Sequence, residues 1–238
     1  LIPIILGFLI PVLFIINNVI YEFSRIDFIK VFNLTTNTVI ISLIATLIIL
    51  VIAVYFQFLK RILKNRTITF FNEVISLTYA LPGAVIGLSL ILLFTSYPLE
   101  NELLIGSFGI LVYAYAIRYM AVGISPLKSS FDKHPSSYDD TAFNLGMGPT
   151  KLFRSIHLPI NKSAIAIAFL ITFVDIIKEL PITLILRPFN FDTLAVQTYE
   201  YAIEEMIPKS SIYSLAIVML GTILLIFLKK IVNKEIDV

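Results

Sequence analysis

Six long apolar runs constrain the fold of this chain more than any other feature of its sequence. They cover Leu1–Tyr21, Thr36–Phe58, Val74–Ser96, Leu103–Val122, Ser163–Leu186 and Ile212–Leu228. Most are close to the ~20 residues that an α-helix needs to cross the hydrocarbon core of a bilayer. They lack the alternation of barrel strands, and only helices satisfy their own backbone groups at that depth without closing a barrel. The pattern predicts an all-α membrane protein with six spans in a single domain, residues 1–238.

Composition supports a membrane protein and excludes several kinds of site. Hydrophobic residues make up 58% of the chain and charged residues only 14%, far from the average of soluble proteins. The sequence contains no cysteine, which excludes disulfides, thiolate metal sites and cysteine nucleophiles. The net charge of +2 is too small to favour nucleic acid as a partner. Pro3, Pro11, Pro82 and Pro181 lie in or near the runs, where we expect them to kink helices.

Basic residues are distributed unevenly between the two sides that six alternating spans define. One side carries 13 of the 18 Lys and Arg residues. These are Lys60, Arg61, Lys64, Arg66, Arg118, Lys128, Lys133, Lys151, Arg154, Lys162, Lys229, Lys230 and Lys234. The other side carries Arg25, Lys30, Arg187 and Lys209, and Lys178 lies within a span. The positive-inside rule makes the richer side cytoplasmic, together with both termini.

The longest polar region, at about residues 123–162, contains the segment DTAFNLGMGPTKLFRSIHLP (Asp140–Pro159). A short helix is expected to begin near Tyr138, capped by Ser136 or Ser137. Asp139 and Asp140 then fall in its first turn, where the helix dipole favours anions.

Glycine and proline divide this polar segment into two parts. Gly146 and Gly148 can end the first helix, and Pro149 can begin a second one at its first position. Two short helices at an angle form a compact knob that is suited to docking a partner. An amphipathic loop that lies on lipid headgroups, helped by Lys151 and Arg154, is the alternative.

The segment resembles the cytoplasmic coupling loop of ABC-importer permeases, the inner-membrane components of binding-protein-dependent transport systems. The pattern of that loop is E-A-A, three residues, Gly, nine residues and I-x-L-P. The sequence keeps Ala142, Gly146, Ile156, Leu158 and Pro159, whereas Asp140 and Thr141 stand in place of Glu and Ala. The resemblance implies a six-helix type I permease bundle whose loop contacts an ATPase subunit through Asp140, Ala142 and Gly146.

A second segment, DIIKELPITLILRPFNFDTLA (Asp175–Ala195), places charges at membrane depth. Asp175, Lys178 and Glu179 are spaced i, i+3, i+4 and are expected to share one helix face. Pro181 is expected to bend the chain beside them. Because charges at such depth usually face a bundle interior or a water-filled cavity, these four residues are candidates for a translocation path or gate. A structural ion pair between Asp175 and Lys178 is the alternative.

This second segment also resembles the permeases of ferric iron importers, through K-E-L-P-x-T-L-x-L-R-P and F-D-T-L-A. Tyr79–Leu90 and Ile117–Gly123 resemble them as well. The resemblance implies one six-helix half of a ferric iron importer in the bacterial inner membrane. Its partners would be ATP-binding cassette ATPase subunits, a second permease half (fused or separate), a periplasmic or lipid-anchored substrate-binding protein, and lipid. The starting Leu1, in place of Met, fits a C-terminal half of a fused chain. Because permeases for thiamine, polyamines, sulfate and molybdate share the loop pattern, another small solute is the alternative substrate.

No catalytic motif is present in the sequence. It lacks a G-x-x-x-x-G-K-[ST] phosphate loop, a G-x-S-x-G elbow and an H-E-x-x-H pair. We therefore expect a non-catalytic transport subunit without a cofactor of its own, with ATP and Mg on the partner ATPase. An ion-driven secondary transporter that uses the charges at membrane depth is a further alternative, but it leaves the loop unexplained.

No metal-binding spacing is found either. His134 and His157 lie 23 residues apart and are expected at a surface or interface. Tyrosine phenolates are possible ligands of ferric iron, although a position at the membrane interface is the simpler interpretation. The tyrosines in question are Tyr113, Tyr115, Tyr119, Tyr199 and Tyr201.

Overall fold

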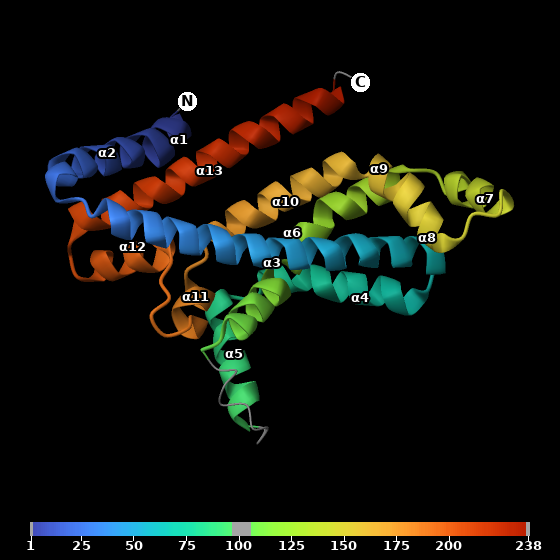
Figure 1. Ribbon diagram of the computed structural model, residues 1–238, viewed down its shortest axis with the longest axis horizontal. Coiled ribbons are helices and arrows are strands. Elements are labelled where there is room, and N and C mark those ends of the chain that lie inside the picture. Colours follow the sequence, from blue (N-terminus) through green and yellow to red (C-terminus); the bar gives the residue numbers. More distant parts are fainter. Residues whose placement is uncertain (1, 97–105, 237–238) are drawn as a thin grey trace.

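The computed structural model describes residues 2–96 and 106–236, in which every regular element is a helix (Figure 1). The main helices are α2 (Ile10–Glu22), α3 (Phe28–Leu63), α4 (Arg66–Leu77), α5 (Gly83–Ser96), α6 (Phe108–Lys133), α10 (Lys162–Ile177), α12 (Leu194–Ile203) and α13 (Ile207–Ile236). The shorter elements are α1 (Ile2–Ile4), η1 (Ile5–Leu9), η2 (Phe23–Arg25), η3 (Thr78–Ala80), α7 (Ser137–Asn144), α8 (Pro149–Leu152), η4 (Phe153–His157), α9 (Leu158–Ile160) and α11 (Pro181–Leu186). The predicted all-α membrane fold is confirmed.

Within the described ranges, four helical segments are long and apolar enough to cross a membrane, namely Ile2–Arg25, Phe28–Leu63, Phe108–Lys133 and Ile207–Phe227. Two further pairs of helices would each form one bent span. The described parts of the six predicted runs are therefore mostly helical, although their limits differ. The helix of the fourth predicted run, α6, begins at Phe108 and continues to Lys133. The predicted start of this run at Leu103 lies outside the described residues.

The third predicted span, Val74–Ser96, is not one straight helix. After α4 and the 3-10 turn η3, Leu81 is extended at φ −73° and ψ 132°. Proline disfavours the helical conformation in the residue before it, and Pro82 follows here. The chain therefore starts a new helix at Gly83, at 110° to the preceding one. As a result α5 projects away from the body of the bundle (Figure 1).

The fifth predicted span, Ser163–Leu186, is divided as well. α10 ends at Ile177, and α11 begins at Pro181, a position where the missing N–H of proline costs no hydrogen bond. The predicted break beside Pro181 is thus confirmed. Because α11 packs against α5, the breaks of the third and fifth spans lie close together.

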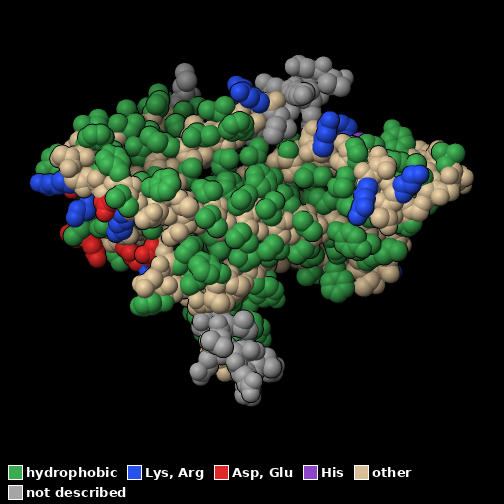
Figure 2. Space-filling view, viewed as in Figure 1, with side chains coloured by type: hydrophobic (Ala, Val, Ile, Leu, Met, Phe, Trp, Pro, Cys, Tyr) green, Lys and Arg blue, Asp and Glu red, His purple; other side chains and the backbone are tan. Residues whose placement is uncertain are grey.

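Apolar side chains both fill the bundle and cover it. The largest core cluster includes Ile49, Leu111, Tyr115 and Ile182, where α3 and α10 pack on α6. Figure 2 shows hydrophobic side chains across the middle of the molecule, Lys and Arg mostly toward its ends, and Asp and Glu at the end that carries α12. So much exposed apolar surface is expected of a bundle surrounded by lipid tails.

Candidate functional site

The polar region between α6 and α10 forms two short helices at one end of the bundle, the end opposite to α12 (Figure 1). As predicted, Asp139 and Asp140 lie in the first turn of α7, and α8 begins at Pro149. Ser136 occupies the cap position of α7, but its side chain makes no capping hydrogen bond. The predicted position of the cap is therefore confirmed, but the predicted hydrogen bond from the cap side chain is not formed.

Gly146 closes α7 in a left-handed conformation. Its φ is +74°, and its N–H donates to the carbonyl of Phe143 at 2.9 Å while the next N–H, of Met147, donates to that of Ala142 at 3.0 Å. These two bonds define a Schellman motif, in which glycine is favoured because it lacks a Cβ. No other atom lies within 4 Å of the place where a Cβ would stand. The requirement for glycine within this chain is thus conformational, and the surface around it is open.

The two short helices present one face outward and bury the other. Asp140 and Thr141 are exposed, and Leu145, beside Gly146, is 75% exposed. Ala142 is buried in a cluster with Phe58, Phe131 and Leu152. Within the chain this side chain therefore holds the loop onto the bundle, and its expected contact with an ATPase stays a prediction.

The I-x-L-P end of the loop connects it to the fifth span. Ile156 packs against the same buried cluster, and Leu158 packs against residues of α3 and α6. Pro159 is exposed. The chain then turns by 70° between Pro149–Ile160 and α10, so the loop is continuous with a membrane helix.

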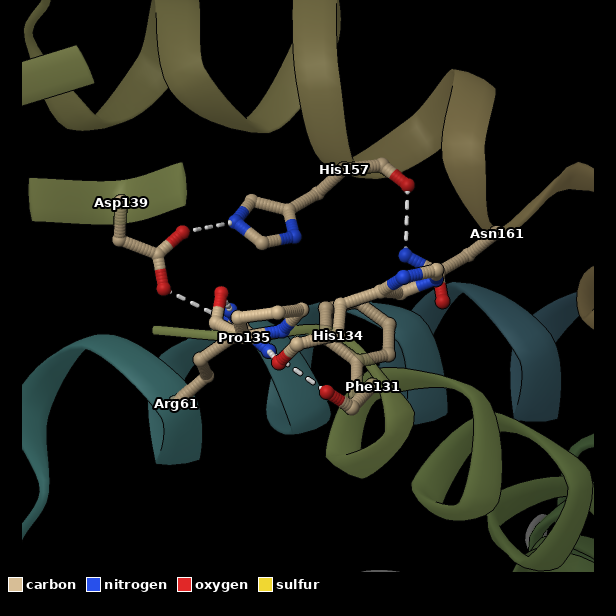
Figure 3. Close-up of polar contacts among 7 residues, drawn as sticks. All are labelled: Arg61, Phe131, His134, Pro135, Asp139, His157 and Asn161. Atoms are coloured by element: carbon tan, nitrogen blue, oxygen red, sulfur yellow. Dashed lines mark hydrogen bonds and ion pairs between the residues drawn. The ribbon is translucent and has the colours of Figure 1, made fainter. Parts of the chain in front are cut away.

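One arginine from α3 fastens the loop to the bundle (Figure 3). Arg61 Nε donates to Asp139 Oδ2 at 2.6 Å. Its Nη1 donates to the carbonyls of Phe131 at 2.6 Å and His134 at 2.9 Å, and its Nη2 donates to that of Pro135 at 2.7 Å. The guanidinium therefore binds the end of α6 and the start of α7 at once.

Behind Asp139 lies His157, whose Nε2 is 2.7 Å from Asp139 Oδ1. Because a carboxylate only accepts, Nε2 carries the proton and donates it. His157 is 3% exposed, so of the expected surface or interface position the surface is wrong, and the ring is buried between the loop, Phe58 of α3 and Phe131 of α6. Burial lowers the pKa of His157 below its usual 6.5, and the hydrogen bond to Asp139 opposes this shift. The lowered pKa favours the neutral imidazole near neutral pH.

The charges at membrane depth do not share one face. Lys178 Nζ pairs with Asp175 Oδ1 at 2.8 Å, and the Lys178 side chain is 61% exposed. Glu179 is 6% exposed and points into the bundle. The prediction of a common face was wrong because α10 ends at Ile177, so helical spacing does not extend to Glu179.

Glu179 instead lies at the meeting point of the two broken spans. Its Oε2 accepts a short hydrogen bond from the hydroxyl of Tyr119 and lies 3.7 Å from Arg118 Nε. Its Oε1 accepts from the N–H of Ile182 at 3.0 Å, in the first turn of α11. Arg118 Nη1 also donates to the carbonyl of Leu81 at 3.4 Å. We call Glu179, Arg118 and Tyr119 the polar joint. Arg118 therefore lies near the middle of α6, and not at a helix end with the basic side chains that the charge count had grouped with it.

Asp175 borders a cavity of about 490 Å³ between η3, α6 and α10. Tyr79, Ser125 and Lys128 also line it, and the hydroxyl of Tyr79 lies 3.5 Å from Asp175 Oδ2. Of the four predicted path residues, only Asp175 lines this cavity.

The five tyrosines do not converge on one point. Tyr115 and Tyr119 are buried and Tyr113 is 52% exposed on the same helix, whereas Tyr199 and Tyr201 lie on α12. No group of three or more His, Asp or Glu residues in the described part of the chain could hold a metal ion.

Comparison with known families identifies the kind of protein that carries this loop. Residues 63–238 match the model of the family described as "Binding-protein-dependent transport system inner membrane component". The chain belongs to this family. The matched range contains the loop, the polar joint and the cavity.

Individual members of the family differ in the transport systems for which they are named. The Fe(3+)-transport system permease protein FbpB 2 of Haemophilus influenzae is 26% identical over 204 residues, which cover 86% of this chain and 40% of that protein. The maltose/maltodextrin transport system permease protein MalG of Escherichia coli is 29% identical over 119 residues, which cover 48% of this chain and 40% of that protein. The chain therefore spans 40% of the length of these relatives in each match.

The sequence of this permease indicated the loop, but not the contacts of Arg61, Asp139 and His157 that hold the loop against the bundle. Arg61 and Asp139 are 78 residues apart, and no local periodicity connects them. Two signals were available: an arginine among lysines at the end of an apolar helix, and a histidine between Ile156 and Leu158 in an apolar setting. Both residue types tend to be paired when they are buried.

Proposed function

We propose that this chain is the membrane-spanning permease subunit of an ATP-driven, binding-protein-dependent importer, with ferric iron as its substrate. The observation that carries the proposal is the loop of α7 and α8. Arg61 and the cluster around Ala142 hold its inner face against the bundle, while Asp140, Leu145 and Gly146 are exposed on its outer face. A loop fixed to the bundle in this way would transmit movement to the helices when a partner binds its exposed face. Family membership makes an ATP-binding cassette subunit the partner of choice.

The subunit itself is proposed to be non-catalytic. Its sequence has no phosphate-binding loop, so ATP and Mg would bind to the partner ATPase. The further partners would be a second permease half, fused or separate, and a periplasmic or lipid-anchored substrate-binding protein on the outer side. The loop end of the bundle would face the cytoplasm, with both termini on that side. A cysteine at Asn33 should then react with an impermeant reagent from outside, and reaction of one at Asn65 from outside would reverse the orientation.

The cavity beside Asp175 is proposed as this half's share of the translocation path. It combines a carboxylate with hydroxyl groups and Lys128 in an otherwise apolar bundle, and polar groups at membrane depth usually line such paths. Glu179 and Pro181 would act as the hinge of the path.

A cysteine at Ser125 should change its reactivity when a nonhydrolysable ATP analogue is added. Ser42, which is fully buried in the core, provides the control position, and equal behaviour of both cysteines would remove the cavity from the path.

Ferric iron is supported by the similarity to the Fe(3+)-transport permease over most of the chain. Another small solute is the second candidate, because relatives named for maltose transport also match. The test is uptake into proteoliposomes that contain the assembled complex with its ATPase and binding protein. We expect ATP-dependent uptake of chelated ferric iron. ATP-dependent uptake of maltose, thiamine, a polyamine or sulfate without iron would select the alternative, and uptake driven by an ion gradient without ATP would reject the importer.

A further inference from the structure

Arg61 is the most fully bonded charged side chain of the loop region. Its four hydrogen bonds to Asp139, Phe131, His134 and Pro135 use most of the five N–H groups of a guanidinium. Its side chain is only 12% exposed, and that of Asp139 only 8%. A pair with so little contact with water differs from an ordinary surface salt bridge.

The contacts continue from Asp139 to the start of the fifth span (Figure 3). The imidazole of His157 stacks on Phe131 with ring centres 5.4 Å apart, and the ring of Phe58 lies 5.3 Å away on α3. The carbonyl of His157 accepts from Asn161 Nδ2 at 2.8 Å, at the bend before α10. We call Arg61, Asp139 and His157 the Arg61 clasp.

The neighbouring residue on α3 provides a contrast. Lys60 Nζ lies 4.0 Å from Asp132, whose side chain is 61% exposed. This pair also joins α3 to the end of α6, but although the Lys60 side chain is only 19% exposed, its partner is in water and the separation is long, so the pair contributes little. The end of α3 therefore carries a long ion pair to an exposed carboxylate and a buried clasp side by side, which makes Lys60 a matched control.

We propose that Arg61 is a positioning residue that makes the coupling loop, the end of α3 and the end of α6 move as one body. The inference rests on the proposed function, because it concerns how movement of the ATPase reaches the membrane helices. With the clasp intact, a displacement of the loop displaces α3 and α6 with it. Both helices contribute to the core, and α6 also lines the cavity beside Asp175. Without the clasp, the exposed face of the loop still binds the ATPase, but its movement no longer reaches the spans.

The experiment compares Arg61→Ala, Arg61→Lys, Asp139→Asn and Lys60→Ala in the assembled complex with ATPase and binding protein. Two quantities are measured: the amount of ATPase that copurifies with the permease, and the ratio of ATP hydrolysed to substrate transported. We expect Arg61→Ala to retain the ATPase and to raise that ratio by about tenfold or more, the order expected for loss of a charge-assisted hydrogen bond. Lys60→Ala should leave the ratio unchanged, and Arg61→Lys should restore part of the coupling because lysine keeps the charge and a donor.

The outcomes separate the two proposals. If the unmodified complex does not retain the ATPase, the proposed function fails. If it does, and Arg61→Ala transports with an unchanged ratio, the clasp has no role in coupling. Should Arg61→Ala fail to assemble, Asp139→Asn decides the matter, because it keeps the shape of the side chain and one acceptor. An unchanged ratio in Asp139→Asn would then overturn the inference, and a raised ratio would support it.

Discussion

Replacing Gly146 by Ala, Asn and Leu would separate backbone strain from contact with a partner. At φ +74° any side chain except that of Asn is disfavoured, by about 1–2 kcal/mol for an ordinary L-residue. No atom lies within 4 Å of a Cβ placed there, so within this chain Leu should cost no more than Ala. The isolated permease is therefore expected to lose the same stability with Ala and Leu, and less with Asn.

Docking of an ATPase on the loop predicts a different ranking of the three Gly146 variants. If the ATPase packs on Gly146, the effect on coupling should follow side-chain size, with Leu the most harmful. The assay pairs thermal unfolding of the isolated permease with binding-protein-stimulated ATP hydrolysis by the complex. Gly148→Ala is the control, since Gly148 has φ −73° and open surroundings. Equal stimulated hydrolysis in correctly assembled Gly146→Ala and Gly146→Leu complexes would refute docking at this position.

Three further predictions concern the joint, the ion pair and pH. A Cβ at Gly83 would lie 2.4 Å from Arg118 Nη1 and 2.8 Å from Glu179 Oε1, so Gly83→Ala should destabilise the isolated permease by about 1–3 kcal/mol; a melting temperature equal to that of the unmodified chain would contradict this. Lys178→Met leaves Asp175 unpaired and should reduce uptake more than assembly, and adding Asp175→Asn should restore assembly but not uptake. Full recovery of uptake in the double variant would make the pair purely structural. Because burial lowers the pKa of His157, the unfolded chain binds a proton there below about pH 6.5 while the folded chain resists it. Stability should therefore fall as the pH drops from 6.5 toward 5, and His157→Gln should flatten this decline in pH-dependent melting curves; an identical decline in the variant would show that His157 does not cause it.

The sequence indicated the helices well because lipid imposes a simple rule on them. An apolar run of ~20 residues has one stable form at membrane depth, and Pro82 and Pro181 each mark a place where a predicted run is interrupted. Local chemistry also indicated the turn at Gly146 and the start of α8 at Pro149. All these features depend on neighbours within a few residues.

Features that depend on distant partners were not accessible in the same way. Nothing in the pattern indicates that Arg61, and not Lys60, turns inward to meet Asp139. The helical spacing that grouped Glu179 with Asp175 failed because the break before Pro181 begins three residues earlier, at Lys178. Burial of His157 and Ala142 likewise follows from how α7 and η4 fold back onto α3, which is a tertiary property.

The central claim is that the loop between α6 and α10 docks on an ATPase, and crosslinking tests it most directly. These 238 residues contain no cysteine, so within them a single cysteine at Asn144, exposed beside Leu145, can carry a benzophenone label at one site. A cysteine at Asn33, exposed near the opposite end of α3, is the control. After illumination of the complex coexpressed with its ATP-binding cassette subunit, we expect an adduct of permease and ATPase from Asn144 and none from Asn33. Absence of that adduct in an assembled complex, or equal adducts from both positions, would contradict the account.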